Sequence, residues 1–239
     1  MTKLRLALLI SGSGTTMEAI INACQSGRLN LEPALVIASR AEAGGLEKAR
    51  ALGIPAEDIL VISKKEQGEN WGQTLVEACQ KRSVDIVGQY GWLPLTPALL
   101  IEAYQDRMIN QHPGPLDPGR ADFGGRGMYG RAVHCARLYF VRKTGHDFWT
   151  EVTAQRVALE FDRGAVLKTK RIEILPSDDV AILQSRCLLY EHETQIEALA
   201  DFASGNVTEI KRAEPLVRAD ELAILTEAKM VATTLYPKG

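Results

Sequence analysis

Residues 4–16, LRLALLISGSGTT, decide the fold, because a short apolar run there meets a glycine-rich turn. The run from Leu4 to Ile10 is nearly continuous, as is typical of a strand buried on both faces of a parallel sheet. The stretch from Thr16 to Gln25 then repeats apolar residues at helical spacing. Together they predict a strand, a tight turn and a helix in succession.

The same alternation continues through the first hundred residues. Further strands are predicted at residues 34–38, 58–62 and 85–88, and helices at 45–52, 71–82 and 97–104. Four strand–helix units in succession predict an α/β fold with a doubly wound, mostly parallel, Rossmann-like sheet.

The pattern changes after residue 113. Residues 114–130 are rich in glycine and form a loop, residues 128–138 suggest a helix, and 148–160 and 166–174 alternate like two strands of an antiparallel hairpin. A long C-terminal helix should then run to about Ala203. We therefore expect a single domain over 1–239, with a βα half (1–105), a second half that contains the loop and the hairpin (106–205) and a C-terminal tail (206–239).

Composition narrows the classes of function. The chain has 239 residues, 46% of them hydrophobic, and a net charge of -2, which gives no general attraction to nucleic acid or anionic membranes. Its four cysteines are scattered, which argues against a metal cluster or a disulfide framework. The chain shows no segment shaped like a signal peptide and no run close to the roughly 20 apolar residues of a membrane span, so we expect a cytoplasmic protein. We also expect it to be a monomer or a homodimer.

The segment Asn110-Gln111-His112-Pro113 carries the clearest chemistry. Side chains two positions apart on an extended backbone point to the same face, so Asn110 and His112 could converge on one reacting group. A neutral donor beside an imidazole suits acyl transfer, since one stabilises an oxyanion and the other moves or stabilises protons. On its own this pair is also an ordinary strand end.

Two other segments contain residues that could bind a ligand or pair with His112. Residues 11–16, SGSGTT, can present free N–H groups at a helix N-terminus, which suits a single phosphate, although a turn without a ligand explains them equally well. Asp162 either caps a turn or pairs with His112. Of the other histidines, we expect His134 to be partly buried and His146 to be solvated.

Taken in order, these segments resemble the glycinamide ribonucleotide transformylase family, also called phosphoribosylglycinamide formyltransferases, which act in purine biosynthesis. The resemblance spans residues 4–202. It rests on the glycine-rich loop at 11–16, the G-x-x-x-A-x-x-x-G-I-P segment at 45–55, the N-x-H-P motif at 110–113, the D-x-G motif at 162–164 and the R-x-x-x-x-E-H motif at 186–192.

The resemblance implies a formyl transfer from 10-formyltetrahydrofolate, as co-substrate, to the primary amine of glycinamide ribonucleotide, without a metal. It makes residues 1–105 the phosphate-binding half and residues 106–205 the catalytic and folate half. It assigns catalysis to Asn110, His112 and Asp162, and contact with the substrate's glycinamide end to Glu191. The substrate phosphate would bind Gly14, Thr15 and Thr16. The folate pocket would be lined by Tyr90, Gly91, Trp92, Leu93, Pro94 and Leu95.

The chain departs from the family pattern near the proposed site. The loop after Pro113 is about four residues longer than usual, and Gln155 stands where the family's hairpin carries a histidine. Alternatives are therefore a sugar-nucleotide formyltransferase, a formyltetrahydrofolate hydrolase, or a non-catalytic module that binds a phosphate ligand. Dependence of folate consumption on the acceptor would distinguish among them.

Overall fold

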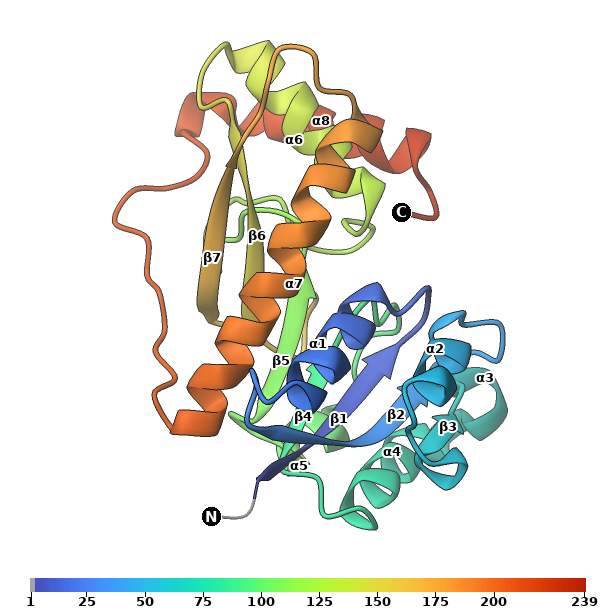
Figure 1. Cartoon of the computed structure of the whole chain (residues 1–239). Coiled ribbons are helices and arrows are strands. Elements are labelled where there is room, and N and C mark those ends of the chain that lie inside the picture. Colours follow the sequence, from blue (N-terminus) through green and yellow to red (C-terminus); the bar gives the residue numbers. More distant parts are fainter. Residues whose placement is uncertain (1–2) are drawn as a thin grey trace. The chain divides into compact units, whose positions relative to one another are not determined.

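A computed structural model describes residues 3–239, which divide into two compact units (Figure 1). The first unit runs up to Gln111 and also includes residues 156–159 and 195–207. The second contains residues 112–155, 160–194 and 208–239. The hydrogen-bonded strand order is β3-β2-β1-β4-β5-β6-β7, so the sheet is mostly parallel and ends on an antiparallel hairpin. This confirms the predicted fold class.

The first unit is built on the parallel strands. They are β1 (Leu4–Ile10), β2 (Leu31–Ala38), β3 (Ile59–Val61), β4 (Ile86–Gln89) and β5 (Met108–His112). β1 pairs with β2 on one side and β4 on the other, which explains why all residues from Leu6 to Ile10 are completely buried. A strand in the middle of a parallel sheet has no solvent face and therefore reads as a continuous apolar run.

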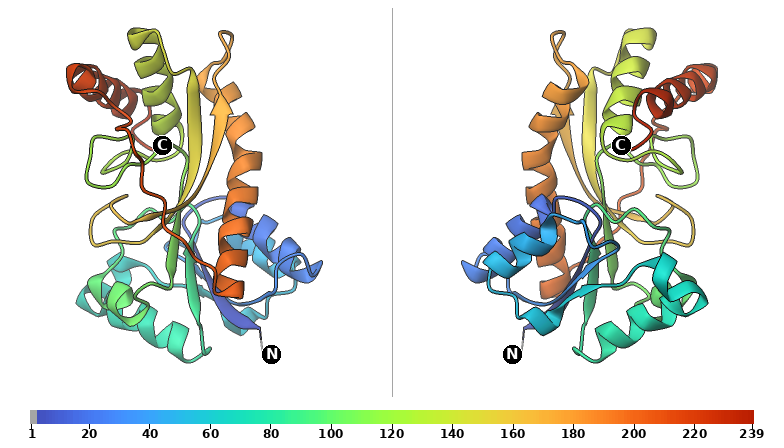
Figure 2. Two further views of the ribbon diagram at one scale, coloured as in Figure 1. Left: turned by 90° about the vertical axis from the view of Figure 1, so that its left-hand side faces the viewer. Right: turned by 90° about the vertical axis from the view of Figure 1, so that its right-hand side faces the viewer.

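Helices cover both faces of these strands. The helices of this unit are α1 (Thr15–Gln25), α2 (Gly45–Ala51), α3 (Lys64–Gln67), α4 (Trp71–Gln80) and α5 (Ala98–Ala103). Figure 2 shows α1 and α2 on one face and α4 and α5 on the other. Ala7 and Leu9 of β1 share a core cluster with Leu75 of α4 and Leu100 of α5, because alternate residues of a strand point to opposite faces.

The second unit is built on the hairpin of β6 (Trp149–Arg156) and β7 (Val166–Glu173). Its helices are α6 (Arg131–Thr144), the first part of α7 (Val180–Ser204) and α8 (Leu222–Leu235). Figure 2 shows α6 and α7 on opposite faces of the hairpin, with α8 alongside α6. The core joins Phe140 of α6 to Val152 of β6 and Ala228 of α8. The C-terminal segment is thus an integral part of this unit.

Three expectations about secondary structure need correction. The helix expected at 128–138 runs from Arg131 to Thr144, because Gly130 has a backbone φ of 52° and Gly145 adopts the left-handed conformation that ends helices. The strand expected at 148–160 ends at Arg156, just after a β-bulge between Ala154 and Gln155. The tail at 206–239 contains α8, which was not predicted. Within residues 3–239, no helix has the length and apolar character needed to cross a membrane.

Candidate active site

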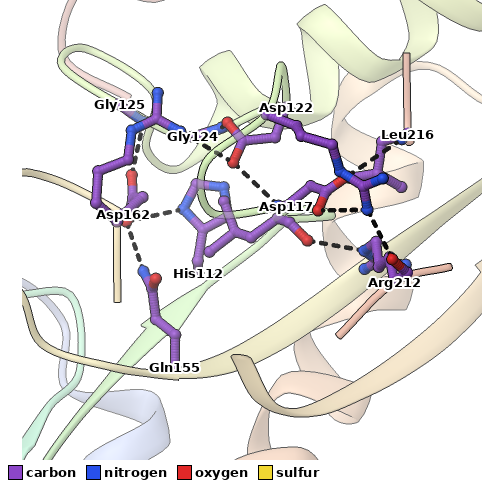
Figure 3. Close-up of polar contacts among 12 residues, drawn as sticks. His112, Asp117, Asp122, Gly124, Gly125, Gln155, Asp162, Arg212 and Leu216 are labelled. Atoms are coloured by element: carbon purple, nitrogen blue, oxygen red, sulfur yellow. Dashed lines mark hydrogen bonds and ion pairs between the residues drawn. The ribbon is translucent and has the colours of Figure 1, made fainter. Parts of the chain in front are cut away.

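A buried histidine and a buried aspartate form the centre of the candidate site (Figure 3). His112 ends β5 and is only 2% exposed. Asp162 lies in the turn between β6 and β7, and its carboxylate atom Oδ1 is 3.5 Å from Nδ1 of His112. Fifty residues of chain separate the two, so only the fold of the second unit brings them together.

Two further hydrogen bonds hold the carboxylate of Asp162. The side-chain amide of Gln155 donates to Oδ1 at 2.8 Å, and the backbone N–H of Gly125 donates to Oδ2 at 2.9 Å. Asp162 itself has a φ of 57°, in the left-handed region that aspartate tolerates better than most residues. The carboxylate is therefore oriented from three sides: by the imidazole, by an amide on the hairpin and by the glycine-rich loop.

The charges of the pair stabilise each other. Burial alone would lower the pKa of His112, but the charge and hydrogen bond of Asp162, with a smaller effect of Asp122, raise it overall. Burial alone would raise the pKa of Asp162, but His112, Gly125 and Gln155 lower it overall. The pair therefore favours an imidazolium beside a carboxylate, and its two protonation steps belong to the pair as a unit.

The other ring nitrogen of His112 is available for chemistry. Nε2 is buried and has no hydrogen-bond partner among the described residues. A carboxylate that binds Nδ1 fixes the orientation of an imidazole and leaves Nε2 to exchange a proton with a substrate or stabilise its charge. Gly114 leaves space beside this nitrogen, because a Cβ at position 114 would lie 3.4 Å from Nε2 of His112 and 2.3 Å from Cγ1 of Val133.

The glycine-rich loop is anchored by carboxylates of its own. Asp122, 1% exposed, accepts hydrogen bonds from the backbone N–H groups of Asp117 and Gly124, both at 3.0 Å (Figure 3). The C-terminal segment adds further anchors: Arg212 donates to the carbonyl of Leu116 at 2.8 Å. This loop is thus tied to the hairpin turn and to the C-terminal segment of the same unit.

The loop predicted to bind phosphate lies in the first unit, between β1 and α1. Gly14 caps α1 with a φ of 69°, and a Cβ there would lie 2.7 Å from Cα of Gly45. The hydroxyl of Ser11 lies 2.7 Å from that of Ser39, and Nε of Arg40 donates to the Ser11 carbonyl at 2.6 Å. A helix N-terminus suits an anion. The contact of Arg40 with this loop was not predicted from the sequence.

The matches to known proteins agree with this architecture. The family model described as formyl transferase matches residues 4–199. The chain belongs to the formyl transferase family. It is 30% identical over 217 residues to the chloroplastic phosphoribosylglycinamide formyltransferase of Arabidopsis thaliana, covering 90% of this chain and 70% of that one. It is 25% identical over 206 residues to the Escherichia coli phosphoribosylglycinamide formyltransferase, covering 85% of this chain and 89% of that one.

Solved structures show the same fold. The crystal structure of glycinamide ribonucleotide transformylase 1 from Symbiobacterium toebii matches with a TM-score of 0.74 and 29% identity, covering 88% of this chain and 95% of that one. The structure of a Coxiella burnetii phosphoribosylglycinamide formyltransferase matches with a TM-score of 0.73 and 27% identity, covering 88% and 92% of the two chains. This formyl transferase therefore has the predicted fold together with a C-terminal segment beyond the residues matched by the family model.

The predicted folate segment of this formyl transferase follows β4. Tyr90 and Trp92 are buried, and the Trp92 ring stacks on Trp71 with centroids 6.1 Å apart. Leu93 and Leu95 are 42% and 43% exposed. The two aromatic residues therefore support the segment from within the core, whereas the two leucines reach its surface. Glu191, predicted to contact the substrate amine, lies on α7 and is buried.

Two histidines differ from expectation. His134 on α6 is 1% exposed rather than partly buried, and burial, with a smaller effect of His112, lowers its pKa to about 4. Its imidazole is therefore neutral at physiological pH. His146 is not simply solvated, because its two ring nitrogens contact the carboxylates of Asp147 and Glu221. Among residues 3–239, no cluster of three histidine, cysteine or acidic side chains could hold a metal ion.

Proposed function

We propose that this formyl transferase moves the formyl group of 10-formyltetrahydrofolate to the primary amine of glycinamide ribonucleotide. The observation that carries the proposal is the buried pair of His112 and Asp162, 3.5 Å apart, in a chain of this family. The named relatives with this fold are phosphoribosylglycinamide formyltransferases. The substrates are small molecules, and the folate serves as co-substrate.

The reaction needs an oxyanion donor and a route for one proton. The amine attacks the formyl carbon and forms a C–N bond, so the carbonyl oxygen gains negative charge. Asn110 donates to that oxygen and His112 stabilises it, while Asp162 holds His112 in orientation. As the tetrahedral intermediate collapses, the bond from carbon to the folate N10 breaks, and the proton lost by the amine goes to N10. Asn110 and His112 are two positions apart on β5, which supports their joint action.

The ligand assignments belong to the same proposal. The amides around Gly14, Thr15 and Thr16 bind the substrate phosphate at the start of α1, and Arg40 adds a positive charge there. Residues 90–95 line the folate pocket, and Glu191 contacts the substrate's glycinamide end. We also propose a cytoplasmic location, consistent with four free, buried cysteines, and a monomer or homodimer, to be established by light scattering.

A product assay tests the function. The purified chain is given 10-formyltetrahydrofolate with and without glycinamide ribonucleotide, with ribose 5-phosphate as the matched phosphate without an amine. We expect tetrahydrofolate and formylated glycinamide ribonucleotide to appear together, and only with the amine. Equal folate consumption without the acceptor would establish a hydrolase instead. Turnover only with an amino-sugar nucleotide would establish a different acceptor class.

A further inference from the structure

One peptide group connects a lysine of α8 to the aspartate of the candidate site. Nζ of Lys229 donates to the carbonyl oxygen of Gly124 at 2.7 Å, and the N–H of Gly125 donates to Oδ2 of Asp162 at 2.9 Å. That carbonyl and that N–H belong to the same peptide unit. The ammonium, the peptide and the carboxylate therefore form one continuous chain of hydrogen bonds.

The two glycines let the peptide lie close to the site. A Cβ at Gly124 would lie 2.6 Å from Cβ of Asp162 and 2.6 Å from Cδ2 of Leu116. Gly125 has a backbone φ of 104°, which residues with a Cβ rarely adopt. The peptide is thus packed against Asp162 on one side and bound by the lysine on the other.

The position of Lys229 follows from the packing of α8. Leu225, Ala228 and Ala232 are buried along one stripe of this helix and join the core of the second unit. Two of these three residues are alanines, which allow α8 to lie close to α6. Lys229 follows Ala228 directly and is half-buried. Its backbone is fixed in the packed helix, and its long side chain can reach the loop.

Several charges surround this lysine. Burial lowers the pKa of Lys229, with Asp122 as the largest opposing influence and smaller effects of Arg163 and Asp162. A charged donor on a carbonyl polarises the peptide and strengthens the hydrogen bond donated by its N–H. The cation therefore acts on Asp162 both through the peptide and through space.

We propose that Lys229 is a positioning residue, which holds the peptide between Gly124 and Gly125 so that Asp162 stays aimed at His112. The proposal rests on the proposed function only for its effect on turnover. It also gives α8 a role: this helix lies outside residues 4–199, matched by the family model, and completes the support of the candidate site.

The pH dependence follows from the charges around the pair. His112 is influenced by Asp162 and Asp122, and it lies close enough to His134 to influence that residue in turn. Removing a nearby cation makes protonation of both His112 and Asp162 easier. Loss of Lys229 should therefore raise both macroscopic pKa values of the pair and move the pH–rate profile toward higher pH.

The test compares Lys229→Met with Lys229→Arg and with Thr226→Ala. Thr226 is exposed on the same helix, and its hydroxyl donates to the carbonyl of Leu222. In Lys229→Met we expect kcat to fall about tenfold, the effect of one weakened hydrogen bond, with KM for both substrates within about twofold. Lys229→Arg should restore most of the turnover, and Thr226→Ala should change neither constant.

A second measurement does not depend on activity. The titration of His112 is followed by NMR of its ring protons, assigned with His112→Gln, in wild type and Lys229→Met. We expect the variant's midpoint to rise by about half a pH unit. A folded Lys229→Met with an unchanged His112 midpoint and an unchanged pH–rate profile would overturn the proposal. If wild type transferred no formyl group, the proposed function would fail while this titration still tested Lys229.

Discussion

Gln155 donates from Nε2 to Oδ1 of Asp162 at 2.8 Å, and the same oxygen faces the imidazole of His112. The resemblance to the transformylase family leads us to expect a histidine at this position of the hairpin, and Gln155 departs from that expectation. In the structure it is 1% exposed and helps to orient the carboxylate. An amide donates to an aspartate without carrying a charge that depends on pH.

Replacement of Gln155 should therefore weaken the pair without abolishing it. In Gln155→Leu, Asp162 loses one hydrogen bond to its charged form, so its pKa should rise and kcat should fall by about tenfold. Gln155→Glu should be worse, because a second buried carboxylate would face the first. Steady-state kinetics from pH 5 to 9 would measure both. Activity of Gln155→Glu equal to that of Gln155→Leu would show that charge at this position is unimportant.

Asn110 should be the most sensitive residue for turnover. Loss of one oxyanion donor typically costs about 3 kcal/mol in the transition state, so Asn110→Ala should lower kcat by two to three decades. Substrate dissociation constants should change little, and the thermal midpoint should stay close to that of wild type. Asn30→Ala, at an exposed position, is the matched control. Near-normal turnover in Asn110→Ala would remove Asn110 from the proposed mechanism.

The glycines of the first loop provide a matched pair of variants. Gly14 has a φ of 69°, and a Cβ there would lie 2.7 Å from Cα of Gly45, whereas a Cβ at Gly12 would meet no atom within 4 Å. Gly14→Ala should destabilise the fold by roughly 1–3 kcal/mol and raise KM for the phosphorylated acceptor. Gly12→Ala should change neither the stability of the fold nor KM for the acceptor. Urea unfolding and acceptor titration measure the two effects, and identical behaviour of the variants would contradict the assigned geometry.

His134 should limit stability at acidic pH. Its pKa is lowered by burial to about 4, so between pH 6.5 and 4 the unfolded chain binds a proton that the folded chain does not. Stability from this residue therefore falls as pH decreases through that range. His134→Met should remove the penalty, worth about 2 kcal/mol at pH 5. The free energy of unfolding at pH 5 and pH 8 checks this, and an equal effect at both values would refute it.

The pair of His112 and Asp162 should contribute most to stability in a window of pH, because its two members respond to pH in opposite directions. Folding raises the pKa of His112, so this residue stabilises the folded chain fully at pH values below its pKa in the unfolded chain. That stabilisation is lost as the pH rises through its pKa in the folded chain. Folding lowers the pKa of Asp162, so this residue stabilises the folded chain fully at pH values above its pKa in the unfolded chain. That stabilisation is lost as the pH falls through its pKa in the folded chain. Breaking the pair with His112→Leu should therefore cost most near pH 5, by roughly 3 kcal/mol. Denaturant unfolding across pH 4–9 measures this window; a cost independent of pH would contradict the ion pair.

The sequence alone determined the alternation of strands and helices in the first unit, the hairpin and the order of the motifs. These follow from local periodicity: the apolar run from Leu4 to Ile10 reads as a buried strand before any contact is known. Helix α8 escaped prediction because its buried stripe is mostly alanine, which gives a weak apolar signal. Gly130 and Gly145 set the ends of α6 through backbone angles that the apolar pattern does not encode.

Only the tertiary structure decided which side chains meet. Asp162 could have capped its own turn, but folding brings it to His112, to Gln155 and to a glycine 37 residues earlier. Lys229 contacts a carbonyl 105 residues earlier in the chain. Sequence periodicity reports which face of an element is buried, whereas a hydrogen bond between distant segments depends on how those buried faces pack together.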